Sequence, residues 1–305
     1  MLDSIKKLDL IDITIDAKDI FDKYIGMNYN QVSEITFTNL FIWRHQYKLK
    51  YAVCNDYLYL ISFKDSEKPY AFLPMGNMES KSFLEAIKVL QQYFDVNGYE
   101  LIIKKIYEDY VDIVLGVLGE DYIADYDRDN SDYLYLTSNL ATLKGKKYHR
   151  KKNHVNKFMS TYNYSYEKID SVNKRACYNI LNKWLLNKKV QSDAYKEEVL
   201  AIKEIVENFE NLDCFGAIIN VDATPQGFTF GEKMNRDTLV IHLEKVNREI
   251  DGLGEFINWQ FCKENFNDSI YINREQDLGI EGLRKAKKSY LPERLVNKYI
   301  IHHKR

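Results

Sequence analysis

The sequence is poor in residues that break or cross-link a chain, and it has little excess charge. Only 4 of its 305 residues are proline, and its 4 cysteines, Cys54, Cys177, Cys214 and Cys262, are far apart and form no CxxC pair. This spacing predicts neither a zinc site nor a disulfide framework, and it is typical of a reducing cytoplasm. The net charge of −2 gives no overall attraction to nucleic acid or anionic lipid, so such binding requires a local patch.

Long apolar runs are also absent from the sequence. No window approaches the roughly 18 apolar residues that span a bilayer, and the N-terminus lacks the apolar run of a signal peptide. The P-loop, HExxH, GxSxG and Rossmann fingerprints are missing as well. We therefore expect a cytoplasmic protein without a metal site or transmembrane segment, at most peripheral at the inner membrane face.

The order of expected elements indicates two α/β domains of similar construction. Turn residues and strand-like or helical periodicity in the second half predict a strand, two helices, three strands, and then alternating helices and strands. These elements cover residues 164–169, 172–187, 192–211, 215–221, 226–233, 238–245, 254–264, 269–272, 281–289 and 295–302. The first half repeats the order, so we predict domains 1–140 and 141–305, each a mixed, mostly antiparallel sheet flanked by helices.

Several segments carry a resemblance to a known family. They are residues 37–43, 143–154, 231–232, 242–245 and 272–290. Together they resemble the family named for the C-terminal domain of phosphatidylglycerol lysyltransferase, in its stand-alone soluble form. The resemblance implies two tandem GNAT-like domains and the transfer of an activated acyl group to an amine or hydroxyl.

The resemblance leaves the donor and the acceptor open. The named enzymes move an aminoacyl group from tRNA to a membrane lipid, and the related Fem-type transferases use tRNA to modify peptidoglycan precursors. Aminoacyl-tRNA is therefore the expected donor, with a phosphatidylglycerol-like lipid or another amine or hydroxyl as acceptor. The alternatives are an acyl-CoA-dependent N-acyltransferase acting on a small amine, and a catalytically silent module that binds RNA or anionic lipid.

A basic run opens the second domain. The run contains basic residues and no acidic residue, and its pattern predicts a helix over residues 146–160. The cations can contact the phosphates of tRNA or of a lipid headgroup, but a charge run is more commonly a solvated helix face. The candidate phosphate-binding residues are Lys144, Lys146, Lys147, Arg150 and Lys151.

Ionisable residues also alternate along the expected strand 238–245. The strand period puts His242 and Glu244 on one face, and Glu232 on the neighbouring strand can join them. Such a cluster can supply the base that acyl transfer requires. The alternative is an ion pair with Lys245 or Arg274 that only braces the sheet.

The segment after the strand 269–272 carries the remaining candidates. Because ligands of open α/β sheets bind beyond the carboxyl ends of strands, we expect substrate contacts here, with Glu275 or Asp277 receiving the α-amino group of an aminoacyl donor. The basic helix that follows suits phosphate, and its terminal tyrosine can protonate a leaving group; the alternative is a plain surface helix. The expected substrate-binding residues are Asn273, Arg274, Glu275, Asp277, Arg284, Lys287 and Lys288, and the catalytic tyrosine is Tyr290.

The loop 248–254 bears on the choice of donor. A CoA-binding loop follows the pattern (Gln/Arg)-x-x-Gly-x-(Gly/Ala), but here Glu249 holds the first position and Arg248 comes one residue early. Asp251 adds negative charge where phosphates would meet a helix N-terminus. These departures weaken the acyl-CoA alternative.

Overall fold

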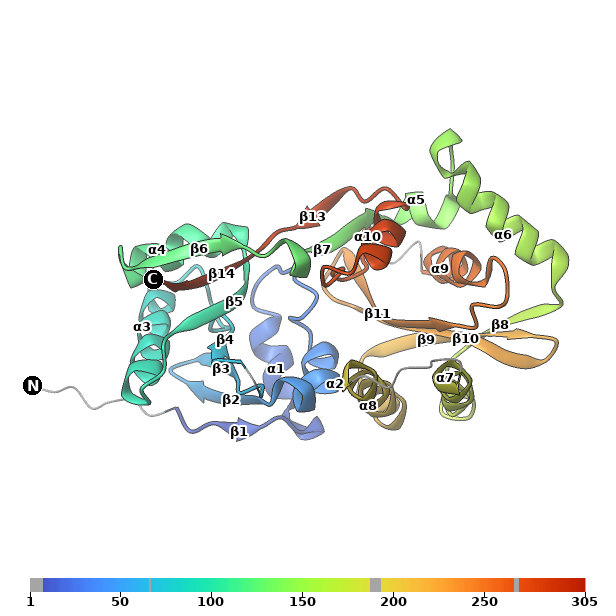
Figure 1. Cartoon of the computed structure of the whole chain (residues 1–305). Coiled ribbons are helices and arrows are strands. Elements are labelled where there is room, and N and C mark those ends of the chain that lie inside the picture. Colours follow the sequence, from blue (N-terminus) through green and yellow to red (C-terminus); the bar gives the residue numbers. More distant parts are fainter. Residues whose placement is uncertain (1–7, 66, 187–192, 266–268, 305) are drawn as a thin grey trace, which may run out of the picture. The chain divides into compact units, whose positions relative to one another are not determined.

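The computed structural model describes residues 8–65, 67–186, 193–265 and 269–304, and these form two compact units (Figure 1). Unit 1 comprises Met1–Ser131 and Val296–Arg305, and unit 2 comprises Asp132–Leu295. Each unit contains one seven-stranded mixed sheet that includes a parallel pair of strands, with helices beside it. The expected α/β class, with two mixed and mostly antiparallel sheets flanked by helices, is confirmed. The ends of the two expected helices at residues 187 and 192 lie outside the described residues.

The sheet of unit 1 has the order β1-β2-β3-β4-β5-β14-β6. Its strands are β1 (Ile11–Asp12), β2 (Leu49–Cys54), β3 (Tyr57–Ser62), β4 (Tyr70–Ala71), β5 (Ile102–Tyr107), β14 (Lys298–His303) and β6 (Tyr122–Tyr126). Its helices are α1 (Lys18–Ile25), α2 (Phe37–Tyr47), α3 (Lys81–Val96) and α4 (Val111–Leu118).

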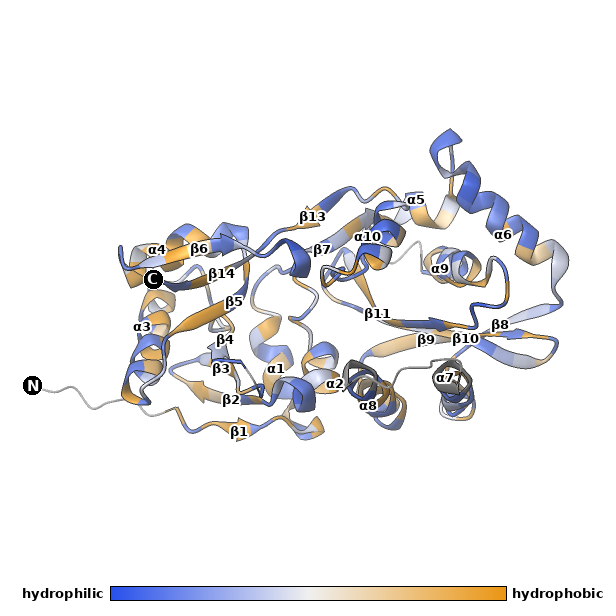
Figure 2. Cartoon of the chain, in the orientation of Figure 1, coloured by the Kyte–Doolittle hydropathy of each residue, from blue (hydrophilic) through white to orange (hydrophobic). Residues whose placement is uncertain are grey.

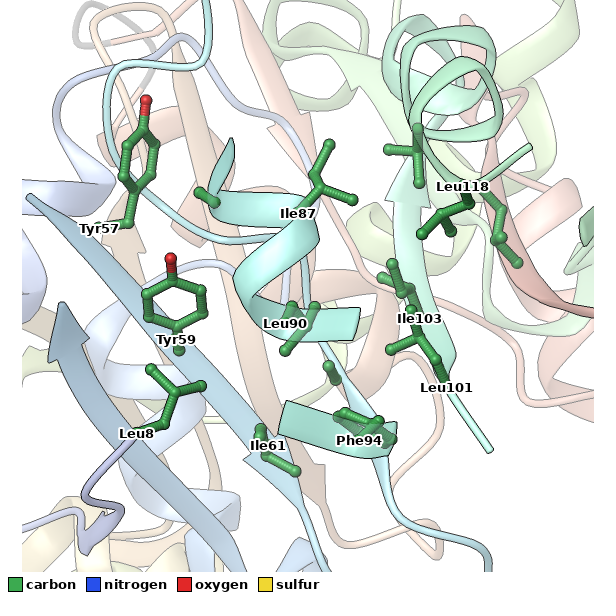
Figure 3. Close-up of a cluster of buried hydrophobic side chains, with 14 of the residues drawn as sticks. Leu8, Tyr57, Tyr59, Ile61, Ile87, Leu90, Phe94, Leu101, Ile103 and Leu118 are labelled. Atoms are coloured by element: carbon green, nitrogen blue, oxygen red, sulfur yellow. The ribbon is translucent and has the colours of Figure 1, made fainter. Parts of the chain in front are cut away.

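The core of unit 1 forms between α3 and the sheet. Apolar residues recur at helical spacing on α3, and Ile87, Leu90 and Phe94 are fully buried because this face packs against strand residues such as Tyr59 and Ile103 (Figure 3). The side chain of Ser80 caps the helix by accepting a hydrogen bond from the Ser82 amide at 3.3 Å.

Unit 2 repeats the arrangement, with the sheet order β8-β9-β10-β11-β12-β7-β13. The strands are β8 (Tyr164–Lys168), β9 (Cys214–Val221), β10 (Thr224–Lys233), β11 (Thr238–Val246), β12 (Tyr271–Asn273), β7 (Asp132–Leu136) and β13 (Arg294–Val296). Helix α9 (Leu253–Glu264) lies on one face of this sheet, and α7 (Ala176–Leu186) and α8 (Asp193–Glu207) lie on the other (Figure 1). The remaining helices are α5 (Thr137–Thr142), α6 (His149–Thr161) and α10 (Glu281–Lys288).

The chain exchanges a strand between the two units. The sequence order assigns residues 295–302 to a single strand of the second domain, but these residues form two strands. The second of them, β14, pairs antiparallel with β5 and β6 of unit 1. Likewise β7, which lies before the expected boundary at 140/141, pairs with β12 of unit 2. Each sheet thus receives its sixth strand from a segment that sequence order alone would give to the other domain.

Candidate functional site

The candidate site lies where two parallel strands of unit 2 part. The ladder of β11 and β12 joins Thr238 to Tyr271, Leu239 to Ile272 and Val240 to Asn273. Strand β12 then ends, whereas β11 continues to Val246 along β10. The second half of β11 and the residues after Asn273 therefore lie at the carboxyl ends of these parallel strands, which is where open α/β sheets hold ligands. We call this region the opening between β11 and β12.

A β-bulge at His242 divides the polar residues of β11 between the two sheet faces. Gly231 pairs with Ile241 but Phe230 pairs with Leu243, so His242 is the extra residue. An extra residue shifts the alternation of all later side chains. Glu244 consequently pairs with Thr229 and faces α9, on the face opposite to Glu232. The cluster of Glu232, His242 and Glu244 that regular alternation predicts is therefore not formed.

His242 instead lies between two carboxylates. Its Nε2 is 2.9 Å from Oε1 of Glu232, and its Nδ1 is 2.9 Å from Oε1 of Glu275. Burial disfavours charge on the ring, but the hydrogen bonds and charges of the two glutamates outweigh it and raise the pKa of His242 to about 9. Both ring nitrogens donate to carboxylates, so this histidine is a buried imidazolium at neutral pH. The contacts favour a bracing role over that of a base.

Glu244 occupies the other face together with Arg274. Its Oε1 lies 3.6 Å from an Arg274 Nη atom, and its Oε2 is buried beside the Asn258 side chain, with no hydrogen bond of ordinary geometry among the described residues. Burial raises the pKa of Glu244 above its ordinary value, and the charge of Arg274 only partly offsets this. A buried carboxylate oxygen without a hydrogen bond destabilises the folded protein, so its presence calls for a functional explanation. Glu244 is therefore the carboxylate best placed to receive a proton from a substrate.

Cations and aromatic rings surround this pair. Arg274 lies 4.8 Å from the ring centroid of Tyr290, and the Lys151 ammonium lies 4.1 Å from the same centroid. Lys151 also binds Glu255 Oε1 at 3.2 Å. Burial, followed by the charge of Arg274, lowers the pKa of Lys287 to about 8. The sequence-predicted residues Glu244, Arg274, Tyr290 and Lys151 thus come together, and the Lys287 ammonium binds the backbone carbonyl oxygens of Arg274 and Glu275 beside them.

Three other predicted contact residues hold the loop rather than face a ligand. Asp277 is fully buried, and it accepts hydrogen bonds from Tyr133 Oη at 2.6 Å and from Arg284 Nε at 2.9 Å. Asn273 is fully buried as well, and its Oδ1 accepts the Glu275 amide at 2.7 Å, which supports the left-handed φ of 57° at Glu275. These bonds give Asp277, Asn273 and Arg284 structural roles, and Lys288 is exposed on α10.

The basic run begins with a 3-10 turn at Lys146–Tyr148 and continues as α6. Tyr148, Val155 and Phe158 are buried and anchor it, and Figure 2 shows that the first turns of α6 are hydrophilic. Lys151 points instead to Glu255 and Tyr290. Four of the five predicted phosphate-binding residues are exposed, and we call these four the basic segment: Lys144, Lys146, Lys147 and Arg150.

Asn258 is a member of the site that sequence reasoning missed. It is 1% exposed on α9, beside Glu244, between the buried residues Ile257 and Phe261. A polar residue inside the apolar stripe of the helix 254–264 is the signal that could have revealed it. No helix among the described residues has the length and apolar character to cross a membrane.

The chain belongs to the family described as phosphatidylglycerol lysyltransferase, C-terminal, whose model matches residues 28–302. The expected family is therefore confirmed. A solved structure of a conserved protein of unknown function from Bacteroides thetaiotaomicron is 32% identical, with a TM-score of 0.91, and the match covers 98% of this chain and 100% of that one.

Two further relatives are more distant. The C-terminal domain of a putative lysylphosphatidylglycerol synthetase from Agrobacterium fabrum is 11% identical, with a TM-score of 0.70 over 95% of this chain and 92% of that one, a likeness of fold alone. An uncharacterized protein of Mycoplasmoides gallisepticum is 25% identical over 203 residues, and the match spans 63% of this chain and 64% of that relative's length. Family and fold together support an acyltransferase.

Proposed function

We propose that this chain transfers an amino acid from aminoacyl-tRNA to a hydroxyl of a phosphatidylglycerol-like lipid, in the opening between β11 and β12. The observation that carries the proposal is the buried Glu244 carboxyl beside Arg274, which keeps one oxygen without a hydrogen bond of ordinary geometry among the described residues. An acyl transfer needs one group to accept a proton and cations to stabilise the oxyanion that develops on the attacked carbonyl. The opening supplies both.

The reaction follows from these contacts. The acceptor hydroxyl oxygen attacks the carbonyl carbon of the aminoacyl ester, and Glu244 takes the hydroxyl proton. Arg274 and Lys287 stabilise the negative charge on the carbonyl oxygen. As the bond to the tRNA ribose oxygen breaks, the phenol of Tyr290 gives that oxygen a proton. The tyrosinate is then reprotonated by solvent and Glu244 releases its proton to solvent, so both groups return to their starting states. Burial raises the pKa of Tyr290, so its hydroxyl is retained as a donor at neutral pH.

The turn before α9 favours aminoacyl-tRNA over acyl-CoA as the donor. A Cβ on Gly252 would lie 2.6 Å from the His154 carbonyl oxygen, so the backbone of α6 covers this turn. Asp251 in the same turn binds the Lys157 ammonium at 2.6 Å. A pyrophosphate needs open amide groups at a helix N-terminus, and it would meet both the covering helix and this carboxylate. The basic segment is exposed and suits the phosphates of tRNA.

The test uses the full chain, phosphatidylglycerol vesicles and tRNA charged with one radiolabelled amino acid at a time. We expect label to leave the tRNA and enter the organic phase with at least one amino acid. Glu244→Gln should lower the rate by roughly a hundredfold or more, the range of a lost general base. The matched control, Glu249→Gln, changes an exposed carboxylate in the loop before α9 and should keep the rate. Failure of every amino acid to leave its tRNA would refute the proposal, as would an undiminished rate in a folded Glu244→Gln variant.

A further inference from the structure

Unit 1 has an opening of its own between parallel strands, and it contains a pocket. Strands β4 and β5 are joined at Ala71 and Ile103, and beyond this point Phe72 and Leu73 line one wall while Lys105 and Tyr107 line the other. The pocket has a cavity volume of about 60 Å³ and opens to solvent; with the open part included, the space is about 550 Å³. The pocket therefore suits a narrow hydrocarbon chain rather than a bulky ligand.

Lys105 is held toward this pocket by an irregularity in β5. The pairing of β5 with β14 joins Ile106 to Tyr299 and Ile103 to Ile301, so two lysines, Lys104 and Lys105, face one residue. Lys105 takes a left-handed φ of 61°, which is unfavourable for a residue with a Cβ. Bulges of this kind redirect a side chain, and strained backbone is concentrated at ligand sites.

The charge of Lys105 is only partly compensated. Its ammonium lies 3.1 Å from Glu34 Oε1 and donates to the neutral amide oxygen of Asn130 at 2.6 Å. The Glu34 carboxylate also binds the Lys298 ammonium through Oε2, so two lysines share this one carboxylate. The side chains of Lys105 and Glu34 are only 10% and 11% exposed. A cation held in this way, at the wall of a pocket, attracts an anionic group.

The remainder of the lining is apolar and aromatic. Tyr24, Tyr110, Met75, Met78 and Val32 are among its residues. Methionine and tyrosine side chains accommodate hydrocarbon bodies of varied shape. Lys105 is the only ionisable lining residue other than tyrosine, and so the only cation, among the described residues.

We propose that unit 1 binds a small amphipathic carboxylate, with the carboxylate at Lys105 and the hydrocarbon body among the tyrosines and methionines of the pocket. The site is separate from the opening between β11 and β12, and it does not depend on the function proposed above. The chemistry is that of binding, because no carboxylate or histidine is among the described residues that line the pocket.

The probe is octanoate, compared with octanol and octylamine of the same chain length, by isothermal titration calorimetry with the full chain. We expect octanoate to bind most tightly and octylamine not to bind. Lys105→Gly removes the amine and relieves the left-handed backbone, while Glu34 keeps its ion pair with Lys298, and binding is compared for the folded variant. This variant should bind octanoate between tenfold and a hundredfold more weakly, which corresponds to about 1.4 to 2.8 kcal/mol.

Two further variants keep the outcome interpretable. Lys104→Met removes the neighbouring lysine, which binds Glu67 at 2.8 Å and does not line the pocket, and octanoate affinity should stay within twofold. Met78→Trp fills the mouth of the pocket at a half-buried position and should abolish binding. Equal affinity for octanoate and octylamine, or unchanged octanoate binding by folded Lys105→Gly and Met78→Trp variants, would overturn the proposal.

Discussion

The buried imidazolium of His242 should make the stability of unit 2 depend on pH in a particular direction. The folded pKa of about 9 lies above the ordinary value of 6.5. The stabilisation is therefore complete below pH 6.5 and is lost as the pH rises toward 9. One pH unit corresponds to about 1.36 kcal/mol, so His242 contributes roughly 3 kcal/mol over the whole interval and about 2 kcal/mol between pH 6.5 and 8.

The interval from pH 6.5 to 8 is the informative one, because Lys287 acts in the opposite direction above it. Its folded pKa of about 8 lies below the ordinary 10.5, so the unfolded state holds more protons between these values and stability rises with pH there. Burial also raises the pKa of Glu275 above its ordinary value, which acts in the same direction as His242 because both groups hold a proton more tightly in the folded state. The loss of stability between pH 6.5 and 8 is therefore assigned to the His242–Glu275 pair.

The measurement is urea unfolding of the full chain at half-unit steps from pH 6.5 to 8, with the transition that includes unit 2 analysed. The wild-type protein should lose about 2 kcal/mol of unfolding free energy across this range, whereas His242→Gln should lose little. The control His45→Gln replaces an exposed histidine of unit 1 and should follow the wild-type curve. A wild-type slope no steeper than that of His242→Gln, or an NMR titration placing the pKa of His242 below 7, would refute the reasoning.

Two other predictions test the structural and electrostatic roles assigned above. Asp277→Ala should destabilise unit 2 by about 3 kcal/mol in urea unfolding, because it leaves the Arg284 guanidinium and the Tyr133 hydroxyl without their partner. Asp251→Ala removes a carboxylate from an exposed ion pair and should cost much less, and equal costs would contradict the structural role. Replacing the four cations of the basic segment with glutamine should lower the slope of log affinity for tRNA against log salt by about 3, whereas an unchanged slope would exclude the segment from the tRNA contact. The control for the second test replaces four exposed lysines of unit 1: Lys48, Lys68, Lys81 and Lys88.

Local sequence signals predicted the central strands of unit 2 well. The expected strands 215–221, 226–233 and 238–245 correspond to β9, β10 and β11 within two residues at each end. The prediction of these strands succeeded because the signals are local: runs of β-branched and aromatic residues are separated by tight turns. In the turn between β9 and β10, Asp222 and Ala223 have positive φ. Local chemistry also indicated that Arg274, Lys287 and Tyr290 belong near Glu244, because strand ends of an α/β sheet gather polar residues.

The features that sequence reasoning could not predict depend on long-range pairing. The bulge at His242 is a property of the register between β10 and β11, and no alternation pattern within residues 238–246 reveals it. The roles of Glu275 and Asp277 could not be separated for the same reason. Asp277 accepts a hydrogen bond from Tyr133, a residue 144 positions away in the sequence, whereas Glu275 lies beside His242. The exchange of β7 and β14 is likewise invisible to element order, because it requires knowledge of which edge each strand joins.

The two openings between parallel strands show how one architecture can hold two different chemistries. In both units only a few residues of the two parallel strands are paired. The strands therefore separate beyond these residues, whichever side chains they carry. In unit 2 the opening holds a carboxylate oxygen without a hydrogen bond of ordinary geometry among the described residues, with cations beside it. Proton transfer requires such an acceptor, because a carboxylate that is already fully bonded has no lone pair to offer. In unit 1 the carboxylate near the opening is Glu34, which binds two lysines, Lys105 and Lys298. Burial raises the pKa of Glu34, but the charges of the two lysines outweigh burial and lower this pKa to about 2. A carboxylate of that kind does not take up a proton near neutral pH, so the opening of unit 1 is suited to holding an anion and that of unit 2 to moving a proton.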